Sequence, residues 1–75
     1  MGRMKRKLLQ SQLEIALLNT EKARDTIKQE LEELQKNDKE DMEQIHLLVN
    51  YKLELLDLKL RLKDMLRHLH LLRFD

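Results

Sequence analysis

Three histidines and scattered carboxylates are the side chains of this 75-residue chain that could bind a metal ion. Asp64 and His68 are four residues apart, so one turn of a helix would point both toward a single ion. A protein metal site needs three or four ligands, however, and His70 would lie about 200° from His68 around a helix. Since His46 is also remote in the sequence, we expect no metal site and no cofactor.

The side chains that catalyse reactions are either missing or poorly placed. The chain contains no cysteine, which excludes thiol nucleophiles, disulfides and thiolate zinc sites. Acidic pairs such as Glu32 and Glu33 lie in a polar stretch, without the apolar walls and converging groups that an active site needs. We therefore expect a protein that is not an enzyme.

Basic side chains near the N-terminus could contact anions. Their charge would attract nucleic acid phosphates, anionic lipids or an acidic protein surface. No aromatic side chain lies among them to stack on bases, and the net charge of the whole chain is only +1. A solvated arm is therefore the simpler interpretation of this cluster, which consists of Arg3, Lys5, Arg6 and Lys7.

The elements that carry these groups are predicted to be helices. Charged residues make up 39% of the chain and hydrophobic residues 41%, with one Gly and no Pro, a composition typical of long helices. In the N-terminal half, small and apolar residues recur every three or four positions, which is the period of a helix. This N-terminal seam consists of Leu9, Leu13, Ala16, Ala23, Ile27, Leu31 and Leu34, with Thr20 at its centre.

The first of these helices is predicted over residues 11–36, behind a basic N-terminal arm over residues 1–10. Ser11 followed by Glu14 matches a capping box, which marks the start of a helix. The basic residues of the arm would sit unfavourably at the positive end of the helix dipole.

A leucine-rich second helix is predicted over residues 42–74, after an acidic polar break over residues 37–41. The break contains no apolar residue, and Asn37 followed by Glu40 matches a helix N-cap. The helix that follows keeps one heptad register over residues 48–72, and in this it resembles a leucine zipper. Its principal seam has Leu48, Leu55, Leu62 and Leu69 at a positions, and Tyr51, Leu58, Met65 and Leu72 at d positions.

A DNA-binding zipper protein is not implied by this resemblance, because in such proteins the basic region directly adjoins the zipper. Here the basic cluster lies in the other half of the chain.

A second apolar stripe runs along the same helix, at b and f positions, and also requires a partner. A helix that is apolar on two faces must be sandwiched between other helices. This second stripe consists of Val49, Leu53, Leu56 and Leu60.

Residues 56–63 also match a β-strand, because leucines alternate there with charged residues. We favour a helix, since Leu, Lys and Arg are good helix formers and β-branched residues are scarce. The alternation instead indicates a risk of aggregation if this segment unfolds.

Two all-α arrangements fit these elements: a continuous coiled-coil helix about 110 Å long at 1.5 Å per residue, or a helical hairpin that assembles into a multi-helix bundle. A hairpin would set the small residues of the first helix against the leucines of the second. Against the hairpin, the break has no Gly or Pro, and it would gather basic residues of both helices at one end. The sequence leaves this choice, the number of chains and their orientation open.

The charges divide the chain into three parts. Residues 1–28 carry seven basic and three acidic side chains, residues 29–43 carry two basic and seven acidic ones, and residues 44–75 carry six basic and four acidic ones.

No apolar run reaches the roughly 20 residues that cross a bilayer, and the segment after the basic cluster is too polar for a signal peptide. We therefore expect an intracellular protein, in the cytoplasm or nucleus.

The predicted function is structural: oligomerisation or scaffolding through coiled-coil or helical-bundle packing, with itself or with other helical proteins as partners. The alternative is a small regulatory adaptor, dimerised by its C-terminal helix, whose basic arm binds nucleic acid or an anionic membrane. If both faces of the second helix are covered, a charge at Leu56 should disrupt assembly as severely as one at Leu62.

Overall fold

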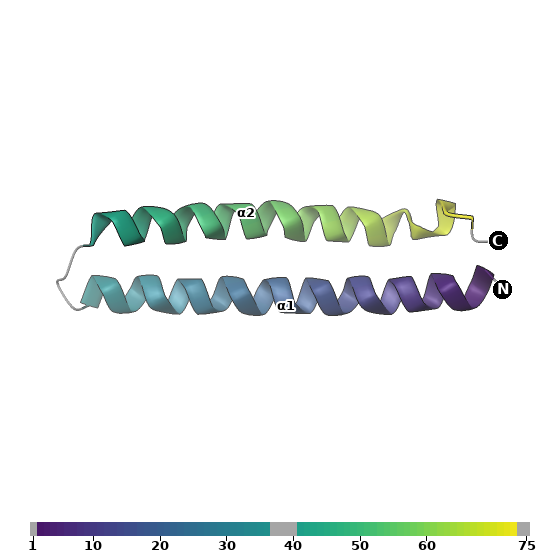
Figure 1. Ribbon diagram of the computed structural model, residues 1–75, viewed down its shortest axis with the longest axis horizontal. Coiled ribbons are helices and arrows are strands. Elements are labelled where there is room, and N and C mark those ends of the chain that lie inside the picture. The colour runs from purple at the N-terminus through teal and green to yellow at the C-terminus, as the bar shows by residue number, and fades with distance from the viewer. Residues whose placement is uncertain (1, 37–40, 74–75) are drawn as a thin grey trace.

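Two antiparallel α-helices lie side by side along their whole length in the computed structural model, which describes residues 2–36 and 41–73 and the side chains from Lys5 onward (Figure 1). Helix α1 comprises Gly2–Lys36 and helix α2 comprises Met42–Arg67, followed by a single 3₁₀ turn, η1, at Leu69–Leu71. The molecule measures 57 × 14 × 14 Å, and the start of α1 and η1 lie at the same end of the hairpin.

The all-α prediction is confirmed, and the helical hairpin is the arrangement that forms. The alternative of one continuous helix was wrong, because pairing the two helices removes from water apolar surface that a single rod would leave exposed. The basic segments at residues 5–7 and 67–73 do lie at the same end of the hairpin, as expected for this arrangement. Exposed charges interact weakly through water, so this gathering does not prevent the packing.

Helix α1 begins at Gly2, so residues 2–10 form its first turns instead of a separate arm. The predicted capping box at Ser11 and Glu14 consequently lies inside the helix. Lys, Arg, Leu and Gln have high helix propensity, and Leu9 is half-buried, so both local preference and packing extend the helix toward the N-terminus.

Helix α2 begins with Asp41 as its N-cap, where Oδ1 of the carboxylate accepts a hydrogen bond of 3.2 Å from the backbone N–H of Gln44. The cap predicted at Asn37 with Glu40 lies outside the described residues. All of residues 56–63 are helical, so the preference for helix over strand in this segment is confirmed.

The C-terminal end of α2 comes earlier than residue 74. The backbone N–H of His68 donates to the carbonyl of Asp64 at 3.1 Å, and η1 then tightens the chain into a 3₁₀ turn that ends in extended backbone at Leu72. Leu69, at the start of η1, is buried, so the tighter turn still packs against the rest of the hairpin.

The interface between the helices is a thin core. Among the described side chains only Thr20, Leu62 and Leu69 are buried, at 5 to 6% exposure. The accessible surface is 6422 Å², whereas a compact folded monomer of 9.1 kDa exposes roughly 4,900 Å². The hairpin therefore leaves an unusually large area, much of it apolar, in contact with water.

Candidate interaction surface

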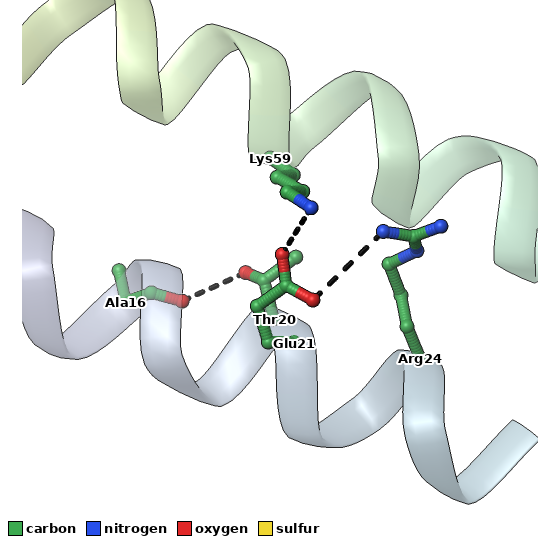
Figure 2. Close-up of polar contacts among 5 residues, drawn as sticks. All are labelled: Ala16, Thr20, Glu21, Arg24 and Lys59. Carbon is green, nitrogen blue, oxygen red and sulfur yellow. Dashed lines mark hydrogen bonds and ion pairs between the residues drawn. The ribbon is translucent and has the colours of Figure 1, made fainter.

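A small polar cluster lies at the middle of the hairpin (Figure 2). The hydroxyl of Thr20 donates a hydrogen bond of 2.7 Å to the carbonyl of Ala16 one turn earlier, which satisfies this buried polar group within α1. Next to it, the Nζ of Lys59 on α2 lies 2.5 Å from Oε1 of Glu21 on α1. Arg24 lies on the other side of the same carboxylate, with 3.9 Å between Nη1 and Oε2.

These contacts change the acidity of Glu21. The hydrogen bond from Lys59 is the main cause that holds the pKa of the Glu21 carboxyl below its ordinary value of 4.5. Partial burial acts in the opposite direction, and the positive charges of Lys59, Arg24 and Lys63 add to the lowering of the pKa. The ionised form of Glu21 is therefore favoured in the folded hairpin.

The N-terminal seam lies along the interface with α2. All seven of its predicted members are half-buried, and Thr20 at its centre is buried. Three and four residues separate these positions, which keeps them on one face of α1 and lets that face approach the second helix.

The a positions of α2 also lie in the interface between the helices. Leu62 and Leu69 are buried, and Leu48 and Leu55 are half-buried. The residues that accompany them on this inner face are at e positions, three before each leucine, instead of at d positions. These e positions are half-buried and hold Ile45, Lys52, Lys59 and Leu66.

The d positions of α2 are displaced from the hairpin interface toward solvent, although sequence reasoning placed them in one seam with the a positions. We call Tyr51, Leu58, Met65 and Leu72 the d face. Their exposed fractions are between 42% and 51%.

Two cavities open beside the d face. One of 390 Å³ is lined by Tyr51 and Leu58 together with Ile27 of α1. The other, of 280 Å³, is lined by Met65 and Leu72 together with Leu9, Leu13 and Leu69. All four residues of the d face thus line a cavity between the helices, where apolar side chains of a further helix could fit.

The second stripe contributes to neither of these two cavities. Leu53 and Leu60 are 59% and 56% exposed, Val49 is 41% exposed, and Leu56 is half-buried. The second stripe is therefore a separate apolar surface of α2.

Sequence reasoning missed further exposed apolar side chains. Leu8, Ile15 and Leu18 of α1 are each more than half exposed, and Met42, Leu47 and Leu71 are exposed as well. The seven-residue spacing of Leu8 and Ile15 was a signal that could have identified a second apolar face on α1.

The hairpin brings the N-terminal basic residues to the C-terminal part of the chain. The guanidinium of Arg6 donates a hydrogen bond of 2.5 Å to the carbonyl of Leu72, which is 66 residues away in the sequence. Lys5 and Lys7, beside Arg6, are exposed. The side chain of Arg3, the remaining member of the predicted cluster, lies outside the described part of the chain.

Asp64 and His68 are the two side chains whose spacing in the sequence suited a shared metal ion. Nδ1 of His68 lies 3.3 Å from Oδ1 of Asp64, so the predicted pair does come together. Within residues 2–36 and 41–73, no group of three or more potential ligands lies close enough to hold an ion. Nor is any described helix long and apolar enough to cross a membrane.

Comparison with known proteins gave no match among protein-family models, curated proteins or solved structures.

Proposed function

We propose that this chain is a structural interaction module, a helical hairpin that self-associates into a four-helix bundle through the d face. The observation that carries the proposal is the exposure of the four d-face side chains beside two cavities lined largely by apolar residues. Such a surface is costly to leave in water, and a second pair of helices would cover it.

The exposed area supports a large interface. Two separate hairpins expose twice 6422 Å², whereas a compact protein of their combined mass exposes roughly 8,100 Å². The difference, on the order of 4,700 Å², is an upper limit on the area that pairing could bury, because a bundle 57 Å long exposes more surface than a compact protein, and this limit leaves room for an interface of the size found in dimers. Because a thin two-helix core contributes little stability alone, folding and assembly are expected to occur together.

Light scattering after size exclusion tests this proposal. The wild-type chain, of 9.1 kDa, should give a particle of twice that mass. Leu58→Glu places a charge on the d face and should yield the mass of a single chain, since burying an unpaired carboxylate is strongly unfavourable. Asn50→Glu adds the same side chain at an exposed polar position of α2 and serves as the control.

Two results would contradict the proposal. One is a wild-type chain that stays at 9.1 kDa at every concentration, and the other is a Leu58→Glu variant that keeps the wild-type mass while Asn50→Glu does too. Circular dichroism of each variant shows whether a change of mass is accompanied by a loss of helix.

A second candidate function is the adaptor that binds an anionic partner. The contact between Arg6 and Leu72 supports it, because that contact brings a basic residue of α1 to the segment that carries Arg73. Binding through phosphates would weaken steeply with salt, whereas association through leucines would not. Titration of the chain with phosphatidylserine vesicles and with a single-stranded oligonucleotide, at low and at physiological salt, separates the two functions.

A further inference from the structure

The two ends of the hairpin carry opposite charge. At the end where the chain starts and finishes, residues 5–7 and 67–73 contain five cationic side chains and no carboxylate. At the opposite end, described residues 30–36 and 41–43 contain five carboxylates and one lysine. We call these the basic end (Lys5, Arg6, Lys7, Arg67 and Arg73) and the acidic end (Glu30, Glu32, Glu33, Asp41 and Glu43).

We infer that two copies of the hairpin pair antiparallel, so that the acidic end of each lies beside the basic end of the other. This inference rests on the proposed self-association and assigns its geometry. A twofold axis perpendicular to the 57 Å length, near the middle of the hairpin, generates this arrangement. The contact between an acidic end and a basic end then occurs twice in the dimer, and it is attractive both times.

Charge separates this arrangement from the parallel one. A parallel dimer would place five cationic side chains beside five others at one end and five carboxylates beside five others at the opposite end. Most of these side chains are exposed, so each interaction is weak, but neighbouring charges within a Debye length of about 10 Å act together. Complementary charge fixes orientation more effectively than it adds affinity.

The positions of the two cavities along α2 are compatible with the same twofold axis. The larger one is lined by Tyr51 and Leu58, toward the acidic end, and the smaller one by Met65 and Leu72, toward the basic end. Along α2 the two lie on either side of Leu62, which is buried near the centre. A twofold axis near Leu62 therefore sets the larger cavity of each copy opposite the smaller cavity of its partner.

Distances between spin labels in the dimer test the orientation. The chain has no cysteine, so a single introduced cysteine carries the label. Gln35→Cys lies 16 residues beyond the middle of α1, about 24 Å along the helix, so an antiparallel dimer should give a label separation of about 48 Å. A parallel dimer would give less than about 25 Å, because packed helices are 8–10 Å apart. Asn19→Cys, at the middle of α1, should give less than about 25 Å in either dimer and is the control.

The outcomes distinguish the inference from the proposed function. A short Gln35 separation in a particle of dimer mass overturns the antiparallel arrangement and leaves self-association standing. A particle of single-chain mass overturns both.

A charge exchange tests the role of the two ends. Glu32→Lys combined with Glu33→Lys leaves three carboxylates and three lysines at the acidic end, so both contacts lose their attraction and dimerisation should weaken about tenfold or more at low salt. At about 0.5 M salt the dissociation constants of this variant and of the wild type should differ by less than about threefold, because exposed charges are then screened. An unchanged dissociation constant at low salt, or a loss of affinity as large at high salt as at low salt, overturns the inference.

Discussion

Glu21 and Lys59 form an ion pair that joins the two helices near the middle of the hairpin. The other ion pairs among the described residues connect neighbours within one segment of chain, as Asp57 and Arg61 do at 3.1 Å. A spacing of three or four residues indicates such pairs within a helix, whereas no spacing in the sequence indicates the pair of Glu21 with Lys59. Because a shift of one helix by a single turn would separate the two charges, this pair helps to set the alignment of α1 against α2.

The lowered pKa of Glu21 predicts how stability depends on pH. Its pKa is lower in the folded chain than in the unfolded chain, so its ionised form stabilises the hairpin above about pH 4.5, and the stabilisation is lost as the pH falls through the lowered pKa. Thermal unfolding followed by circular dichroism at pH 6 and pH 3 should therefore show a larger loss of stability for the wild type than for Glu21→Gln.

Asp57→Asn provides the matched control for Glu21→Gln. This substitution removes a carboxylate whose ion pair with Arg61 lies within α2. Because the Asp57 side chain is 62% exposed, the variant should show nearly the same pH dependence of stability as the wild type. Equal pH dependence of Glu21→Gln and the wild type would rule out a stabilising role for the pair with Lys59.

Each helix pairs through one face, and the pattern of apolar residues predicted that face better for α1 than for α2. Half-buried positions of α1 match the predicted seam because its outward positions are mostly polar. In α2 apolar residues surround most of the helix, so the pattern could not show which two heptad positions would face α1. The inner location of the e positions could not be predicted because two of them hold lysine, which is usually a surface residue. The aliphatic part of Lys59 nevertheless lies along the interface, while its ammonium group reaches Glu21.

Local sequence patterns could not predict whether the chain forms a hairpin or one continuous helix. No Gly or Pro separates α1 from α2, so the segment between them lacks the residue types that usually indicate a turn. The decision depends on contacts between residues far apart, such as Arg6 with Leu72. Local propensity does determine the all-helical composition, which is why that part of the prediction succeeded.

At the level of the helix pair, we predict unequal contributions from two leucines. Leu62 is 5% exposed, and Leu62→Ala should lower the free energy of unfolding by about 2–4 kcal/mol, because it leaves a cavity at the interface. Leu71 is 65% exposed, so Leu71→Ala should cost less than about 1 kcal/mol. Urea unfolding at one fixed chain concentration measures both values, and equal losses would show that Leu62 does not anchor the helix pair.

For the whole molecule, self-association predicts a stability that depends on concentration. Diluting a dimer one hundredfold costs about 2.7 kcal/mol, which for a particle of two such chains lowers the midpoint of thermal unfolding by about 8 °C. Scans of the wild-type chain at two concentrations a hundredfold apart measure this shift. A hairpin that folded alone would unfold at the same temperature in both.

The order of the two helices also matters during synthesis on the ribosome. Translation completes α1 before α2, so residues 56–63, whose alternating leucines favour β-aggregation in an unfolded chain, emerge when the residues of α1 are already available to pair with them. Pairing can then proceed from the acidic end toward the chain ends, and closing the longer loop from Glu21–Lys59 to Arg6–Leu72 adds only about 0.5 kcal/mol. The nascent chain thus exposes this segment only after the helix sequence that covers it has been synthesised.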